Sequence, residues 1–140
     1  MLNILVPVDG SKYSENIARY LIELNKYTNG LEIHLLNVQI QLSGDINMFI
    51  DKDQIDRYRH DEGLKALQKT RELLDKAGIS YTFHIGVGHT AETIVNYAKE
   101  KQCTQIVMAM HGLGSISSLL MGSVVTKVIH LSPVPITLVK

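Results

Sequence analysis

Two segments of this chain contain the residues best suited to chemistry, an acidic turn near the N-terminus and a glycine- and serine-rich stretch near the C-terminus. Asp9 directly follows the apolar run from Asn3 to Val8. Its carboxylate can accept hydrogen bonds from ribose hydroxyls or from an adenine amine. It can equally cap the start of a following helix, as aspartate often does. The residues alone leave both interpretations open.

The second segment contains several glycines between two apolar runs. Gly112 and Gly114 allow backbone amides to approach an anion closely, and Gly122 and Ser123 precede a predicted helix whose N-terminal dipole favours phosphate. A Walker loop is excluded because no Gly-Lys-Ser or Gly-Lys-Thr follows. Glycines at such places also serve simply to form tight turns, so this pattern alone does not establish a phosphate site.

Strands and helices alternate along the whole chain. Short apolar runs predict strands at 3–8, 31–38, 81–87, 104–110 and 136–139, and helical periodicity predicts helices after Ser11 up to about Gly30, at 53–77, at 90–101 and from a Ser123 cap. This alternation indicates right-handed crossovers and a parallel sheet with helices on both faces. We therefore predict an α/β fold, a doubly wound five-stranded parallel sheet with strand order 3-2-1-4-5.

Composition limits the class of protein. The chain has 140 residues, 45% of them hydrophobic, which predicts a single domain over 1–140. Fourteen basic residues balance fourteen acidic ones, so we expect no nucleic-acid partner. The single Cys103 cannot form an internal disulfide, and we find neither a signal peptide nor the roughly 20 apolar residues that a membrane span needs. These features predict a cytoplasmic protein without a membrane partner.

Several motifs together resemble the universal stress protein family along the whole chain. They are ILVPVDGS, the AETI that starts at Ala91, IVMAMHG, LLMGSVV and the terminal SPVPITLVK. The ATP-binding branch of that family carries Gly, two residues, Gly, nine residues, then Gly-Ser or Gly-Thr. Gly112, Gly122 and Ser123 match this spacing, whereas Ala109 replaces the first glycine. The extra methyl group would crowd the base or ribose if the family glycine lies against them.

The resemblance implies a role for each matched position. Asp9 would face the ribose or adenine, and the backbone of Val38 would contact the adenine edge. The residues that the resemblance places around the nucleotide are Pro7, Val8, Asp9, Val38, Met108, Gly112, Gly122, Ser123 and Val124. The implied ligand is ATP, with Mg²⁺ as its possible companion.

The predicted function is that of a regulatory module that binds ATP in a stress response. Hydrolysis needs a positioned base and a cation on the γ-phosphate, and the segment from Gly112 to Ser123 contains no lysine or arginine. We therefore predict no enzyme, or at most a slow ATPase. A sensor of a cyclic adenine nucleotide or a cyclic dinucleotide is the alternative.

Two other classes with similar sheets fit the sequence less well. A dinucleotide oxidoreductase would carry GxGxxG after the first strand, where this chain has VDGSKYS. A phosphoacceptor receiver domain would end its third strand in aspartate, where this chain has Gly86-Val-Gly88.

The remaining candidates favour structural roles. None of the six histidines belongs to a metal-binding motif, so we predict no protein metal site. A structural role for His111 in its turn is favoured over contact with a phosphate. Cys103 is expected to be a small buried residue rather than a nucleophile. The apolar residues 48–50 either fold over the ligand, pack on a partner or anchor their loop.

The last predicted strand favours a homodimer. An apolar strand at 136–139 should form a sheet edge, and such edges are usually covered or paired. Pairing with a second copy across a two-fold axis, through Ile136 and Leu138, would cover it. The alternative is a monomer whose edge is protected by Pro133, Pro135 and Lys140.

Overall fold

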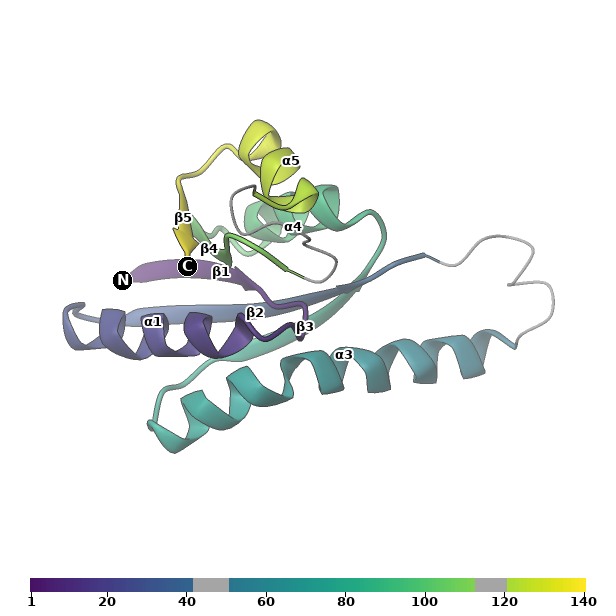
Figure 1. The fold of residues 1–140 in the computed structure, drawn as a ribbon, viewed down its shortest axis with the longest axis horizontal. Helices are drawn as coiled ribbons and strands as arrows, with labels where there is room; N and C mark the ends of the chain where they lie inside the picture. The colour runs from purple at the N-terminus through teal and green to yellow at the C-terminus, as the bar shows by residue number, and fades with distance from the viewer. Residues whose placement is uncertain (42–50, 113–120) are drawn as a thin grey trace.

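The structure, a computed structural model, describes residues 1–41, 51–112 and 121–140. Strands and helices alternate through these ranges (Figure 1). The strands are β1 (Leu2–Pro7), β2 (Leu31–Gln39), β3 (Thr82–Val87), β4 (Gln105–Ala109) and β5 (Ile136–Val139). The helices are α1 (Ser14–Lys26), α3 (Lys52–Lys76), α4 (Thr90–Glu100) and α5 (Ser123–Leu131).

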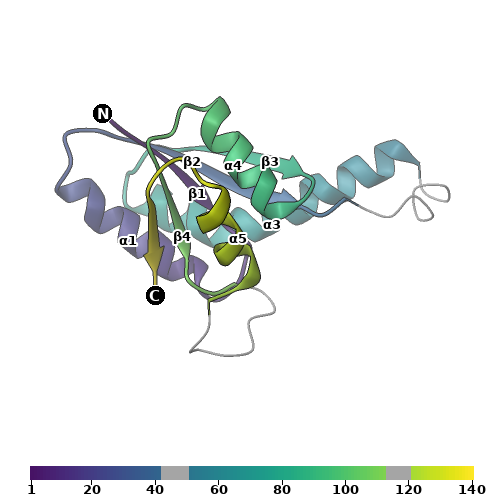
Figure 2. The ribbon, with the colours of Figure 1, turned by 90° about the horizontal axis from the view of Figure 1, so that it is seen from above.

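All five strands form one parallel sheet in the order β3-β2-β1-β4-β5, which confirms the predicted α/β topology. Helices α1 and α3 cover one face of this sheet, and α4 and α5 cover the other (Figures 1 and 2). Strands β3 and β5 are its two edges. The strand order reverses between β1 and β4, because the connections on the two sides of this point run over opposite faces of the sheet. Doubly wound sheets form their ligand sites at such a point.

Strand β1 lies at the centre of the sheet because helices cover both its faces. Ile4, Leu5 and Val6 are fully buried. Ile4 and Val6 pack into the core beneath α1 and α3, whereas Leu5 packs into the core beneath α4 and α5. This two-sided burial explains why the first strand is an almost unbroken apolar run rather than an alternating one.

The ends of the elements differ from the predicted ones by a few residues, and some helix details were wrong. Ser123 is the first helical residue of α5 and not its cap, which is Gly122. Helix α1 begins at Ser14 behind Tyr13, and no side chain caps it. Ile129 lies at the helical spacing of the buried residues of α5 but is 42% exposed. Periodicity places a residue on a helix, but the extent of the neighbouring elements decides whether that face is covered.

Two glycines shape helix α3, one just after its C-terminal end and one in its middle. Gly78 has φ +71°, the left-handed conformation that commonly ends a helix, and its amide donates to the Asp75 carbonyl at 3.0 Å. Gly63 lies in the middle of the helix, where a Cβ would stand 2.7 Å from Cδ1 of Ile85 on β3. The absence of a side chain at Gly63 lets the helix approach the sheet.

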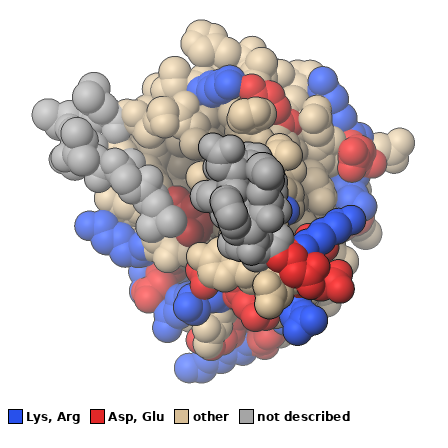
Figure 3. Space-filling model, turned by 90° about the vertical axis from the view of Figure 1, so that its right-hand side faces the viewer, with Lys and Arg blue, Asp and Glu red and all other residues tan. Residues whose placement is uncertain are grey.

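The described surface carries charges of both signs. On the face in Figure 3, lysine and arginine side chains are interspersed with aspartate and glutamate rather than gathered into a patch of one sign. Among the helices of the described ranges, none has the length and apolarity to cross a membrane. The predicted apolar segment Met48–Ile50 and the predicted phosphate-loop residue Gly114 lie outside the described residues.

Candidate functional site

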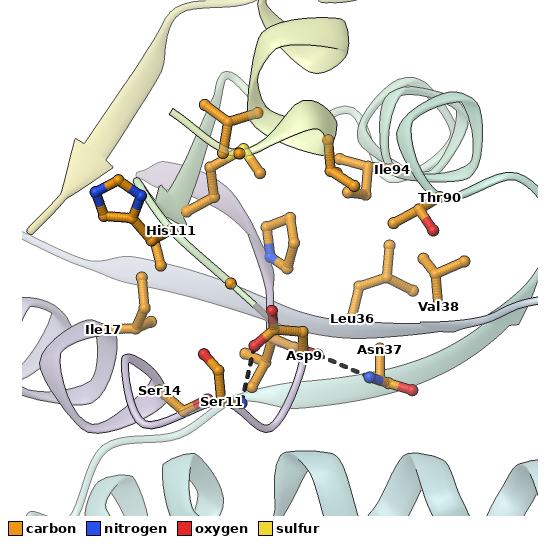
Figure 4. Close-up of a pocket in the computed structure, with 18 of the residues that line it drawn as sticks. Asp9, Ser11, Ser14, Ile17, Leu36, Asn37, Val38, Thr90, Ile94 and His111 are labelled. Carbon is orange, nitrogen blue, oxygen red and sulfur yellow. Dashed lines mark hydrogen bonds between the residues drawn. The ribbon is translucent and has the colours of Figure 1, made fainter. Parts of the chain in front are cut away.

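A cavity of about 360 Å³ lies at the carboxyl ends of β1 and β4, where the chain changes face (Figure 4). Its volume falls in the range of small-molecule sites, roughly 300–1,000 Å³. All nine residues that the sequence nominated line it, namely Pro7, Val8, Asp9, Val38, Met108, Gly112, Gly122, Ser123 and Val124. The fold thus brings the acidic turn and the two glycine positions to one cavity. Whether they bind a nucleotide remains a prediction.

Asp9 stabilises the turn before α1 and also lines the cavity. Its Oδ1 accepts a hydrogen bond from the amide of Ser11 at 2.9 Å, so one oxygen stabilises the turn that leads to α1. Its Oδ2 lies against Gly112, where a Cβ would overlap it. Gly10, the next residue, has φ +81°, which favours glycine. A Cβ at this position would lie 3.0 Å from the Cα of Ala66. The carboxylate is therefore held at the cavity by a tight turn.

Asn37 was missed by the sequence analysis. It is 4% exposed, and its Nδ2 donates to the carbonyl of Val8 at 2.8 Å. Gln39 donates in turn to Oδ1 of Asn37 at 2.7 Å. These bonds tie the end of β2 to the turn that carries Asp9. The available signal was a single amide inside the otherwise apolar end of the second strand.

Helix α5 directs its N-terminus at the cavity. Its N-cap Gly122 has φ −63° and ψ 156°, an ordinary extended conformation. The first helical hydrogen bond runs from the Thr126 amide to the Gly122 carbonyl at 3.1 Å, so the amides of Ser123 and Val124 precede it. Such amides and the helix dipole favour an anion.

The remaining wall is mostly apolar. Leu36 and Val38 from β2, Ile94 from α4 and Met108 from β4 line the cavity. Figure 4 shows Val38, Ile94 and the Thr90 hydroxyl together on one side of Asp9. A flat aromatic ligand group fits such walls, with polar atoms at one end only. Leu36 and Ile94 were not nominated from the sequence, because apolar lining residues look like core residues; the polar Thr90 was missed as well.

Two side chains of the described lining are ionisable, Asp9 and His111. No lysine or arginine lines the cavity within the described ranges. The His111 ring lies 5.8 Å from the ring of Tyr13, and Lys12 lies above the Tyr13 ring at 5.3 Å. Nδ1 of His111 is buried and forms no hydrogen bond with a described residue. His111 thus contacts Tyr13, the residue before α1, and also borders the cavity.

The fold and the cavity define a doubly wound α/β protein with a ligand-sized site at its topological switch point. The sequence profile described as the universal stress protein family matches residues 1–140. The chain belongs to this family.

Individual relatives agree with that assignment. Universal stress protein YxiE of Bacillus subtilis is 29% identical over 98% of this chain and 97% of its own. Universal stress protein MJ0531 of Methanocaldococcus jannaschii is 27% identical over 98% of this chain and 81% of its own. The solved structure of hypothetical protein MJ0577 superposes with a TM-score of 0.82 at 26% identity, covering 99% of this chain and 94% of that one.

Two more distant structures contain adenine nucleotides. The universal stress protein of Archaeoglobus fulgidus was solved with dAMP, and it has a TM-score of 0.70 at 22% identity, over 100% of this chain and 98% of that one. Another universal stress protein was solved with cAMP, with a TM-score of 0.72 at 21% identity, over 99% and 97%. At these identities, the likeness establishes the shared fold.

Proposed function

We propose that this chain binds an adenine nucleotide in the cavity, with the base between β2 and α4 and the phosphates towards the N-terminus of α5. The observation that carries the proposal is the convergence, in one cavity, of the Asp9 carboxylate, an apolar slot and the first amides of α5. These groups suit a ribose, a base and a phosphate respectively. The nucleotides bound to the two structural relatives support the same ligand class.

Within that class, we favour ATP as the regulatory ligand of a single universal stress protein domain in the cytoplasm. The spacing of Gly112, Gly122 and Ser123 supports ATP, because it agrees with the ATP-binding branch of the family at these positions. Ala109 is the departure from that spacing, and it lies at the cavity wall. Restoring the glycine by Ala109→Gly should maintain or raise ATP affinity if the methyl group crowds the ligand.

The charge of the cavity lining determines how Mg²⁺ would contribute to ATP binding. The described lining has no lysine or arginine, and residues 112–123 contain none in the sequence. Helix amides offer only partial positive charge to a triphosphate. A magnesium ion would therefore be held mainly by the phosphates, because Asp9 is the only carboxylate of the described lining. We expect added Mg²⁺ to raise the affinity for ATP more than that for AMP or cAMP.

The lack of basic groups also supports the alternative ligands. A cyclic or monophosphate nucleotide carries less charge and needs less compensation, so a cyclic adenine nucleotide fits the same cavity. The lack of basic groups also argues against rapid hydrolysis, since residues 112–123 provide no lysine or arginine to stabilise the γ-phosphate. The protein is therefore proposed to be a binding module, at most a slow ATPase.

The direct test is calorimetry with ATP, AMP, cAMP and a cyclic dinucleotide, each with and without Mg²⁺. Binding of any adenine nucleotide at up to millimolar concentration supports the site, and the order of affinities identifies the ligand. Gly122→Val then tests the phosphate end. Its φ permits a side chain, so we expect the fold to survive and the affinity to fall. Equal binding by this variant would exclude the proposed phosphate position, and no binding of any nucleotide would exclude the function.

We also propose a homodimer through β5. This strand is a sheet edge, and its four side chains are all half-buried. Ile136 and Leu138 pack against the core on the α5 side. Their lysine variants would therefore disturb the core as well as an interface. Sedimentation of the unmodified protein at tens of micromolar is the cleaner test, and a monomer there would contradict the proposal.

A further inference from the structure

Part of the cavity lining comes from the start of α1 and the residue before Gly112, and the proposed nucleotide pose leaves it unused. We call this part the α1 side of the cavity. Its residues are Ser11, Ser14, Ile17 and His111. Figure 4 shows them on the side of Asp9 opposite to Val38 and Ile94. The cavity therefore offers a second wall beyond the Asp9 carboxylate.

The hydroxyl of Ser14 is buried in this wall without a hydrogen-bond partner. Ser14 is 4% exposed, and its Oγ makes no hydrogen bond with any residue that the structure describes. Its backbone, in contrast, is engaged. The Ser14 amide donates to the Ser11 carbonyl at 3.0 Å, and the Ser14 carbonyl accepts from Oγ1 of Thr70 at 3.4 Å. A buried hydroxyl is costly to leave unpaired, so a ligand group that reaches it binds favourably.

The imidazole of His111 places a second such atom on the same side. Its Nδ1 is buried and has no hydrogen-bond partner in the described ranges, while the ring packs beside Tyr13 with centroids 5.8 Å apart. A hydroxyl can donate and accept, and an imidazole nitrogen does one or the other according to its tautomer. The Asp9 carboxylate, when ionised, only accepts. These three groups together suit ligand atoms that both donate and accept hydrogen bonds, as hydroxyls do.

The charges on this side favour a hydroxyl over a phosphate. Asp9 is the only carboxylate of the described lining, and a phosphate beyond it would meet this negative charge. Lys12 belongs to the same turn, but its Nζ lies 5.3 Å from the centroid of the Tyr13 ring and the residue is not part of the lining. The first amides of α5 offer a phosphate a better place.

We propose that Ser14 and His111, together with Asp9, bind the ribose hydroxyls of the nucleotide and select ribonucleotides over deoxyribonucleotides. This inference rests on the proposed function. With the base between β2 and α4 and the phosphates at α5, the ribose lies at Asp9 and turns its 2′- and 3′-hydroxyls towards the α1 side. A site built to hydrogen-bond a hydroxyl rejects an analogue that lacks it, because the buried polar groups of the protein then stay unpaired.

The first experiment compares ATP, 2′-deoxyATP and 3′-deoxyATP by calorimetry in excess Mg²⁺. The three ligands share the base and the triphosphate, so a difference in affinity reports the sugar. We expect ATP to bind at least about tenfold more tightly than one or both deoxynucleotides. Equal affinities would mean that Ser14 and His111 contact only water, which overturns this inference and leaves the nucleotide site standing. No binding of any of the three would overturn the proposed function itself, and this inference with it.

Variants assign the preference to particular side chains. Ser14→Ala removes the hydroxyl, and His111→Phe removes the nitrogens but keeps a ring against Tyr13. In each, the preference for ATP should fall by at least about threefold, because ATP affinity drops while deoxynucleotide affinity changes by less than about twofold. His111→Asn, which restores a polar group near the position of Nδ1, should retain more of the preference than His111→Phe. Ser80→Ala, at an exposed position after α3, is the matched control. A preference unchanged in both Ser14→Ala and His111→Phe would assign it to Asp9 alone and contradict the proposal.

The stability of the nucleotide-free protein separates binding from folding. Because Oγ of Ser14 has no partner among the described residues, Ser14→Ala should leave the urea midpoint unchanged or slightly higher. This result, combined with a weaker preference for ATP, supports the role of the hydroxyl in binding. A lower midpoint with an unchanged preference would show that the hydroxyl serves the fold, and it would contradict the assignment.

Discussion

The close contact between Gly112 and Asp9 can be tested with a single methyl group. A Cβ at Gly112 would overlap Oδ2 of Asp9 and would stand 3.3 Å from its Cγ. Gly112 does not adopt a positive φ, so its backbone accepts alanine without strain. Gly112→Ala should therefore act through the Asp9 carboxylate, which has to move.

The size of the effect follows from what holds that carboxylate. Oδ1 of Asp9 accepts from the Ser11 amide at 2.9 Å, and rotation of the carboxylate breaks or weakens this bond. A hydrogen bond to a charged group contributes about 1.5–3 kcal/mol, less where water can replace it. We expect Gly112→Ala to cost about 1–3 kcal/mol, divided between the free energy of unfolding and that of nucleotide binding. If all of it appears in binding, affinity falls roughly 5- to 150-fold.

A double-mutant cycle isolates the contact. Urea unfolding and ATP calorimetry are performed on the unmodified protein, Gly112→Ala, Asp9→Ala and the double variant. In the Asp9→Ala background the added methyl group has room, so we expect a coupling free energy of at least about 1 kcal/mol. The loss of unfolded-chain entropy caused by replacing glycine is common to both backgrounds and cancels. An equal cost of Gly112→Ala in both backgrounds would refute the steric argument.

Three further predictions concern the rest of the fold. Gly63→Ala should destabilise the protein by about 1–3 kcal/mol in urea unfolding, because crowding against Ile85 exceeds the gain of about 1 kcal/mol in helix propensity, and Ile85→Ala should remove that penalty. Burial raises the pKa of Cys103 to about 11, so its alkylation at pH 8 should be at least about a hundredfold slower in the folded than in the unfolded protein, and equal rates would contradict this. The hydrogen bond from Lys127, at 2.6 Å, lowers the pKa of Glu92 below its unfolded value; the resulting stabilisation is present above the unfolded pKa and is lost as the pH falls through the folded one. The difference in Tm between the unmodified protein and Glu92→Gln should therefore shrink on acidification, and a constant difference would exclude this ion pair as its cause.

The strand order and the general location of the site were accessible from the sequence because they depend on local signals. The unbroken apolar run around Leu5 requires helices on both faces of its strand, and the regular alternation of elements leaves few topologies to consider. In a parallel sheet the residues after neighbouring strands meet at one edge, so Asp9 and Gly112 could be assigned to one site without coordinates. Several motifs along the chain resembled the universal stress protein family, which the family model confirms, and the spacing of Gly112 and Gly122 resembled its ATP-binding branch.

The tertiary structure alone decided which side chains meet and which faces are covered. His34 and His84 come together through a strand register that joins residues 50 positions apart, and no local pattern encodes that pairing. Asn37 lines the cavity, and its amide reaches across to Val8, just after the neighbouring strand β1. Ile129 is 42% exposed although it shares the helical spacing of Val125 and Val128, because that part of α5 faces solvent. Apolar periodicity reports the local conformation that a segment prefers, whereas register and contact depend on long-range packing that involves the whole chain at once.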